Sequence, residues 1–143
     1  MDGAMRRVEV VAGVLEDRGE VLCARRGPSP HAHLDGKWEF PGGKVESGES
    51  HAAALVREWH EELGVAIEVG SFLCAVTHRY PDLEVVLHVY RCQWSAEGER
   101  SRLQCHDHVA VCWLPVQRLR EVDGEWAAAD IPVVDWLLTR RNT

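Results

Sequence analysis

The chain has 143 residues, of which 45% are hydrophobic and 27% are charged, a composition typical of a globular domain and not of a disordered chain. Its 23 acidic residues outnumber its 16 basic residues, so the formal net charge is −7. Such a surface repels phosphate backbones and anionic membranes, and we expect neither polymeric nucleic acid nor a membrane as partner. A small phosphorylated ligand is still compatible with this charge, because metal ions bridge two sets of negative charge.

The N-terminal residues lead directly into a strand-like run and carry no apolar signal segment. The five cysteines form an odd number and include no CxxC pair, which indicates reduced thiols rather than a disulfide framework. No repeat, low-complexity tract or linker divides the sequence. We therefore expect one cytoplasmic domain over residues 1–143, either a monomer or a homodimer.

Hydrophobic periodicity predicts strands and two helices in mixed order. Ser50 is placed to cap a helix that runs to Leu63, and Gly64 is placed to end it. Pro41-Gly42-Gly43 is expected to break the short strand-like run before it. The other predicted elements are strands at Val8–Leu15, Glu20–Arg25, Lys37–Phe40, Val65–Arg79, Leu83–Trp94 and His108–Leu114, and a last helix at Ile131–Arg140. This order predicts an α+β sandwich.

The predicted helix after Ser50 carries a cluster of carboxylates. Glu58, Glu61 and Glu62 stand at positions i, i+3 and i+4, so all three project from one side of the helix. Like charges this close repel one another, and a divalent cation removes the conflict. Mg²⁺ takes oxygen ligands and keeps waters and substrate phosphates in its shell. A solvated acidic helix face is the plain alternative.

These glutamates belong to a longer pattern, Gly43-x5-Glu49-x7-Arg57-Glu58-x-x-Glu61-Glu62-x-Gly64-Val65. The pattern resembles the signature box of the Nudix hydrolases at every charged and glycine position over residues 43–65. One position departs from the family, since Trp59 stands where an aliphatic residue is usual. Trp59 falls on the buried side of the helix, so the departure concerns local packing rather than chemistry.

The resemblance implies an α/β/α sandwich with a mixed sheet and a loop-helix-loop metal site. It also implies hydrolysis of a nucleoside diphosphate linked to another group, with Mg²⁺ as cofactor and Mn²⁺ able to substitute. By position, the implied metal ligands are Glu58, Glu61 and Glu62, with the Gly42 carbonyl as a further ligand. Glu49 and Arg57 are implied to hold the ligand helix and its loop in place and are counted with the catalytic residues.

Two further segments are similar to the MutT branch of that family, the Gly36–Glu46 stretch and the arginine pair Arg25-Arg26. The similarity implies a nucleotide site lined by Arg26, by His31 or His33, and by Glu39, Phe40, Pro41 and Gly42. Asp107 occupies the place of a further metal-binding or base-like carboxylate. A zinc site at Cys105, His106, His108 and Cys112 is an alternative, but no paired-ligand motif supports it.

Asp130 precedes the last helix, at the position where MutT-like proteins contact the base. An ionised aspartate only accepts hydrogen bonds, which suits the exocyclic amine of cytosine. The Ala129–Pro132 and His106–His108 segments resemble CTP pyrophosphohydrolase relatives within the branch. An ordinary helix N-cap is the alternative for Asp130.

The function expected from these features is Mg²⁺-dependent hydrolysis of a nucleoside triphosphate to the monophosphate and pyrophosphate. The expected substrates are cytidine nucleotides or modified and oxidised deoxynucleotides. Another nucleoside diphosphate derivative, such as ADP-ribose, is a second hypothesis. A non-catalytic nucleotide-binding module is a third, although no glutamate of the box is missing.

Overall fold

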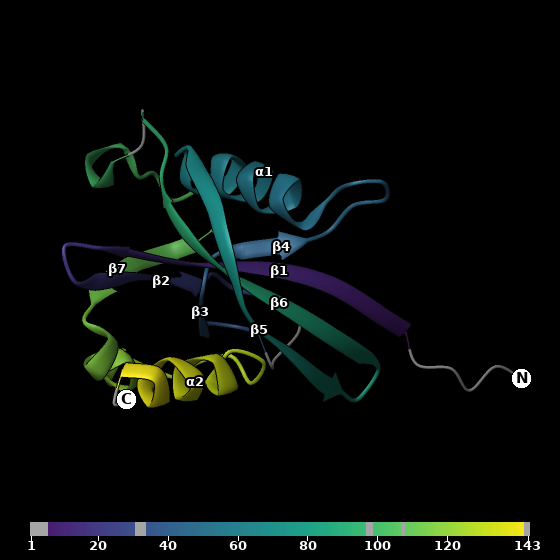
Figure 1. The fold of residues 1–143 in the computed structure, drawn as a ribbon. Coiled ribbons are helices and arrows are strands. Elements are labelled where there is room, and N and C mark those ends of the chain that lie inside the picture. The colour runs from purple at the N-terminus through teal and green to yellow at the C-terminus, as the bar shows by residue number, and fades with distance from the viewer. Residues whose placement is uncertain (1–5, 31–33, 97–98, 107, 142–143) are drawn as a thin grey trace, which may run out of the picture.

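The computed structural model describes residues 6–30, 34–96, 99–106 and 108–141 of the chain. One mixed sheet lies between two helices, with α1 (His51–Leu63) on one face and α2 (Ile131–Arg141) on the other (Figure 1). This arrangement confirms the predicted α+β sandwich. No helix among the described residues is both long and apolar enough to cross a membrane.

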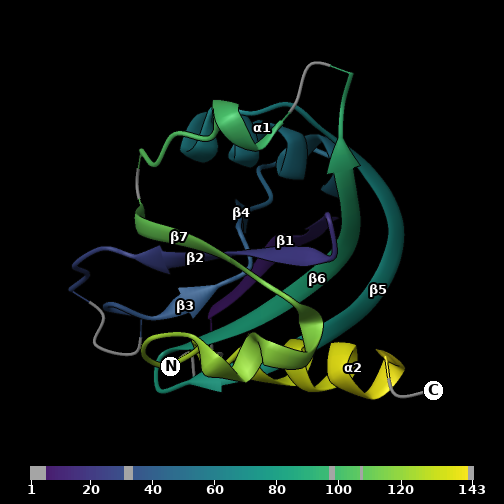
Figure 2. The same ribbon diagram turned by 90° about the vertical axis from the view of Figure 1, so that its left-hand side faces the viewer.

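The sheet has seven strands, and five of them follow the order β3-β2-β1-β6-β5 (Figure 2). The strands are β1 (Arg6–Asp17), β2 (Glu20–Arg26), β3 (Trp38–Glu39), β4 (Gly42–Lys44), β5 (Ile67–Tyr80), β6 (Leu83–Trp94) and β7 (His108–Leu114). β1 and β6 run parallel, while β4 pairs with β1 and β7 pairs with β2, both antiparallel. Two short 3₁₀ helices that the sequence analysis did not predict, Arg100–Arg102 and Val116–Glu121, complete the fold.

The expected break of the strand before Pro41-Gly42-Gly43 is confirmed, because β3 ends at Glu39, but Gly42–Lys44 then form a strand that was not predicted, β4 on β1. A side chain at Gly42 would collide with the Val11 carbonyl, so only glycine permits this close approach of the two backbones. The residues that punctuate the sequence therefore build a strand. Their use here is to bring the chain between β3 and α1 tightly against β1.

Helix α1 begins and ends as predicted. The Ser50 hydroxyl accepts a hydrogen bond from the Ala53 amide at 3.1 Å, and Gly64 adopts the left-handed conformation with φ 67°. The buried face of the helix consists of Ala54, Leu55, Trp59 and Leu63. This face packs against Val11, Leu15, Leu22 and Cys92 of the sheet and forms with them the first core, the α1 core. The ends and the buried face of α1 fix which side chains face away from the core.

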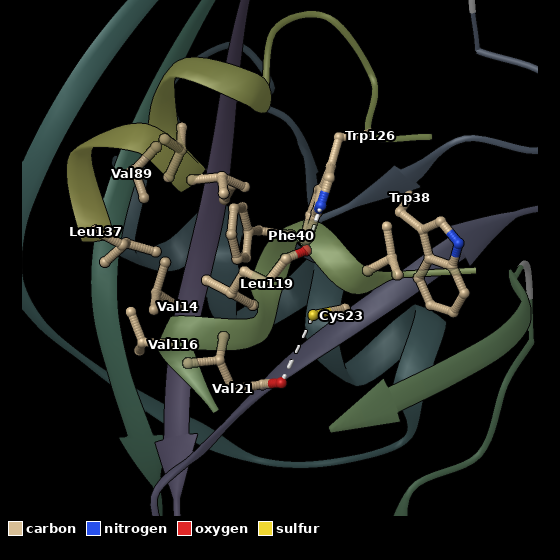
Figure 3. Packing of buried hydrophobic residues seen from close by; sticks show 14 of the residues in the cluster. Val14, Val21, Cys23, Trp38, Phe40, Val89, Val116, Leu119, Trp126 and Leu137 are labelled. Atoms are coloured by element: carbon tan, nitrogen blue, oxygen red, sulfur yellow. Dashed lines mark hydrogen bonds between the residues drawn. The ribbon is translucent and has the colours of Figure 1, made fainter. Parts of the chain in front are cut away.

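The second core lies between the sheet and α2 (Figure 3). Phe40 and Trp126 pack with ring centroids 4.7 Å apart, and the Trp126 indole donates to the Leu119 carbonyl at 2.8 Å. Along β1, Ala12 and Val14 belong to this core, whereas Val11 and Leu15 belong to the α1 core. The strand is buried on both faces, which explains its nearly continuous apolar sequence.

Candidate active site

Arg57, in the middle of α1, connects an acidic residue before the helix with acidic residues on it. Its Nε and Nη2 donate to the two carboxylate oxygens of Glu49 at 2.7 and 3.0 Å, and its Nη1 donates to Glu58 at 2.7 Å. Nη2 also donates to the Lys44 carbonyl at 3.1 Å. The guanidinium thus ties the helix to β4 and to the loop that follows it. This geometry supports the holding role predicted for Glu49 and Arg57.

The same contacts give a pH-dependent prediction. Hydrogen bonds from Arg57 and from the Glu46 amide lower the pKa of Glu49 from 4.5 to about 2. A lowered folded-state pKa stabilises the fold above pH 4.5 and loses that contribution as the pH falls toward 2. Arg57→Met should therefore lower the free energy of unfolding at neutral pH, and the difference from the parent chain should shrink in acid. Urea denaturation at several pH values measures it, and a difference independent of pH would contradict the assignment.

Two of the three helix glutamates, Glu58 and Glu62, line a cavity in the protein. Gly42 and Gly43 line the same cavity. Glu61 is not among the lining residues; its side chain is 57% exposed and pairs with Arg57 Nη1 at 3.3 Å. The structure therefore brings together Glu58, Glu62 and the Gly42 backbone at the cavity, and Glu61 does not line it.

Glu58, Glu62 and the Gly42 backbone fit a hard cation. Two carboxylates and a nearby backbone carbonyl are oxygen donors of the kind that Mg²⁺ takes, with waters or phosphates completing its shell. Gly43 leaves room for the Glu58 carboxyl group against the backbone, since a side chain there would collide with it. Within the described ranges no three His, Cys, Asp or Glu side chains form a ready-made metal-binding group. Asp107, the predicted further ligand, lies outside the described residues.

Gly43→Ala tests whether the reaction needs the space that Gly43 leaves for the Glu58 carboxyl group. The added methyl group would displace the Glu58 carboxyl, the far end of a flexible side chain, so the fold should survive while the carboxylate moves. We expect turnover to fall by about tenfold or more, with a change in unfolding free energy of about 1 kcal/mol. Steady-state kinetics and thermal unfolding measure the two effects. Unchanged turnover would show that the position of Glu58 does not matter for the reaction.

The cavity has a volume of about 540 Å³ and is lined by two kinds of residues. Its charged lining residues besides the two glutamates include Arg26, Glu39, Lys44 and Glu46. Its apolar wall comprises Val8 and Val10 of β1, Leu34, Phe40, Tyr80, and Leu83, Val85 and Leu87 of β6. The site thus combines charged groups with apolar surface that suits a flat group.

Asp130 also lines the cavity and is buried, with only 6% of its surface exposed. Its Oδ1 accepts a hydrogen bond from the Phe40 amide at 3.0 Å, so the side chain binds the β3–β4 connection and does not cap α2. Burial, and then the nearby Glu39 carboxylate, raise the pKa of Asp130 well above its ordinary value. Asp130 still stands at the N-cap position, because its carbonyl accepts hydrogen bonds from the Val133 and Val134 amides at 3.0 and 3.1 Å. The raised pKa also favours the neutral acid, which donates as well as accepts.

The remaining predicted residues are divided between the cavity and its supports. Arg26, Glu39, Phe40 and Gly42 line the cavity. Pro41 does not line it; its carbonyl accepts hydrogen bonds from the Gly13 amide and the Trp59 indole, both at 2.9 Å. His31 and His33 lie outside the described residues. Pro41 thus acts as an anchor for α1 and β1.

The apolar wall and the position of His108 were not predicted from the sequence. Alternating residues of β1 and β6 form most of the wall, and parallel register pairs Val10 with Leu87 on the same face. Alternation was visible in both strands, but their pairing was not. His108 is buried and contacts Glu39 at 2.8 Å rather than Cys105, His106 or Cys112, which contradicts the zinc alternative.

Known proteins resemble the chain along nearly its whole length. The NUDIX domain family matches residues 5–137. The chain is 34% identical to the CTP pyrophosphohydrolase of Escherichia coli over 96% of both chains. It is 31% identical to the 8-oxo-dGTP diphosphatase of Proteus vulgaris over 75% of this chain and 96% of that one.

A solved structure agrees with these sequence matches. The solution structure of the E. coli ORF135 protein superposes with a TM-score of 0.78 at 33% identity, covering 99% of this chain and 95% of that one. Sequence, fold and the glutamate-lined cavity point the same way. The chain belongs to the NUDIX domain family, among its MutT-like hydrolases.

Proposed function

We propose that this chain is a Mg²⁺-dependent nucleoside triphosphate pyrophosphohydrolase that releases a nucleoside monophosphate and pyrophosphate. The observation that carries the proposal is one cavity lined by two kinds of groups. Glu58 and Glu62 line it together with an apolar wall and a buried polar side chain, Asp130. A nucleotide has the same division between its phosphates and its base.

The charged residues of the cavity suit the phosphates. Glu58 and Glu62 would hold the cation, and Arg57 keeps the Glu58 carboxylate in place from outside the cavity. A bound Mg²⁺ would neutralise phosphate charge and make a water molecule more acidic. Arg26 presents a guanidinium, whose N–H groups match phosphate oxygens. Water then attacks a phosphorus of the triphosphate in line with the leaving group, at the β position in this proposal.

The apolar wall of the cavity suits the base of a nucleotide. Phe40 and Tyr80 offer aromatic surface, and Asp130 offers hydrogen bonds to the edge of a base. An ionised Asp130 accepts from the amine of cytosine, whereas its neutral form also donates and so suits oxidised guanine. This chemistry, together with the names of the relatives, supports cytidine and modified or oxidised deoxynucleotides as substrates.

A substrate panel tests the proposal. CTP, dCTP, 5-methyl-dCTP, 8-oxo-dGTP and ADP-ribose would be compared with equal Mg²⁺, with chelator as a control, by measuring released pyrophosphate and monophosphates. We expect pyrophosphate release from at least one triphosphate, and none with chelator. Hydrolysis of ADP-ribose alone would replace the proposed substrate class. Nucleotide binding without any hydrolysis would indicate a non-catalytic module.

Asp130→Asn gives a prediction about base preference. Asparagine always donates and accepts, so it cannot replace the ionised form of Asp130, which only accepts. A preference for cytosine nucleotides that depends on the ionised form should therefore fall relative to oxidised guanine nucleotides, by about tenfold in the ratio of kcat/KM. The ratio for dCTP and 8-oxo-dGTP in the variant and the parent chain measures this shift. An unchanged ratio would remove Asp130 from base selection.

The proposal also includes the identity of the cation, the cellular location and the oligomeric state of the protein. We infer that Mg²⁺ is the working cation and that Mn²⁺ substitutes for it, because both accept carboxylate and water ligands. We also propose a single cytoplasmic domain, acting as a monomer or homodimer on free nucleotides. Activity with each cation and the mass of the protein in solution test these parts.

A further inference from the structure

His108 is a buried histidine at a junction of three strands. It is the first residue of β7, where it lies opposite Arg26 of β2 in the antiparallel register. Glu39 of β3 pairs with Ala24 on the other side of β2. The His108 side chain is 3% exposed. A polar side chain this deeply buried requires partners for its ring nitrogens, and the proposed function assigns it none.

The first partner of His108 is Glu39. His108 Nε2 lies 2.8 Å from Glu39 Oε2, while Arg26 Nη1 donates to the other oxygen, Oε1, at 3.2 Å. With a proton on Nε2, the imidazole donates this bond to the carboxylate. The Glu39 carboxylate is therefore held at both oxygens, by His108 at Oε2 and by Arg26 at Oε1.

This clamp matters because of where Arg26 lies. Arg26 and Glu39 line both the 540 Å³ cavity and a neighbouring polar cavity of about 350 Å³, and His108 lines the second. A free arginine side chain samples many rotamers, and ordering it on ligand binding opposes affinity. A carboxylate that is itself fixed removes part of that penalty before the ligand arrives.

The other ring nitrogen faces the carboxylate helix. His108 Nδ1 is buried, has no hydrogen-bond partner among the described residues, and lies 3.9 Å from Glu62 Oε2. That distance is too long for a hydrogen bond. The ring is therefore anchored on the Glu39 side, while its opposite edge borders the proposed cation-binding end.

We propose that His108 is a positioning residue of this active site, which fixes Glu39 and, through Glu39, sets Arg26 for the phosphates of the nucleotide. The inference rests on the proposed function, because it requires that Arg26 binds an anionic ligand such as the phosphates of a nucleotide. His108 acts through Glu39 and takes no part in bond making or breaking. Its removal should therefore weaken nucleotide binding more than it slows turnover.

Three substitutions separate this role from general packing. A glutamine at position 108 presents an amide N–H near the place of Nε2, an asparagine presents one near Nδ1, and a leucine presents none. We expect KM to rise by about tenfold or more in His108→Asn and His108→Leu, with kcat within about threefold of the parent value. His108→Gln should restore KM to within about threefold of the parent chain.

The matched control is His60→Gln, since His60 is an exposed histidine of α1. Thermal unfolding of each variant identifies any loss of the fold. A His108→Gln variant as impaired as His108→Leu would overturn the proposal, as would a fall in kcat at unchanged KM.

A second measurement needs neither activity nor a folded leucine variant. In ¹⁵N-histidine-labelled protein, the Nε2–H proton of His108 should be protected from solvent exchange, and Glu39→Gln should shift its resonance. An Nε2 without a protected proton, or one unaffected by Glu39→Gln, would overturn the inference. Absence of hydrolysis by the parent chain with every nucleotide would instead overturn the proposed function, while this signal still reports the contact.

Discussion

Glu62→Gln and Glu58→Gln are each expected to reduce kcat by at least about 100-fold, with little change in stability. Both carboxylates line the cavity beside Gly42 and Gly43, where the structure offers oxygen donors to a cation. Glutamine keeps the shape of the side chain but removes its negative charge, so the cation loses a strong ligand while the helix keeps its packing. Steady-state kinetics with saturating Mg²⁺ measure the loss.

Direct metal binding separates this explanation from a general defect. Titration with Mn²⁺, followed by electron paramagnetic resonance, should show weaker binding in both variants. Glu121→Gln is a suitable control, because Glu121 is exposed on the 3₁₀ helix near α2 and pairs only with Arg118 in the described contacts. Near-normal turnover in both cavity variants would exclude Glu58 and Glu62 as the metal ligands.

Trp59→Ala is expected to lower the free energy of unfolding by about 3–5 kcal/mol. Trp59 is 0% exposed in the α1 core, and its indole N–H donates to the Pro41 carbonyl at 2.9 Å. Removing the ring leaves a large cavity and deletes the contact that ties α1 to the connection before β4. Urea denaturation measures the loss, and turnover should fall as well because Gly42 and Gly43 follow Pro41.

Two further variants refine this prediction. Trp59→Phe keeps most of the ring but loses the indole N–H, so we expect a smaller loss of about 1–2 kcal/mol. Val56→Ala, on the exposed side of the same helix, should change stability by only about 0.5 kcal/mol. A Trp59→Ala variant as stable as Val56→Ala would show that the indole is not needed for packing.

The structure also explains how a tryptophan fits where an aliphatic residue is usual. Gly13 of β1 faces the indole, and a Cβ at that position would lie 3.1 Å from Trp59 Cζ2 and 2.8 Å from Cys92 Sγ. The missing side chain on the strand provides the space that the larger ring fills. The sequence shows both residues, but 46 positions separate them, and no local pattern indicates that they touch.

Short-range features of the site could be predicted from the sequence, because they depend on residues within a few turns of one helix. Ser50 and Gly64 mark the ends of α1 through hydrogen bonds and backbone geometry that are local. The helical period likewise places Glu58, Glu61 and Glu62 on one side of α1. The same period explains the difference among them: at about 100° per residue, Glu61 is turned toward Arg57, and Glu62 is turned away from it.

The long-range features were decided only by the tertiary structure. Which glutamates enter the cavity depends on how α1 sits over β4, and that strand approaches β1 closely because Gly42 has no side chain. Asp130 reaches the Phe40 amide across 90 residues, and His108 reaches Glu39 across 69. Such contacts form when a sheet brings distant segments together, so their partners cannot be read from local spacing. The sequence by itself determined the family, the carboxylate helix and the class of chemistry, whereas packing of the sheet against both helices determined which side chains share the cavity and which support it.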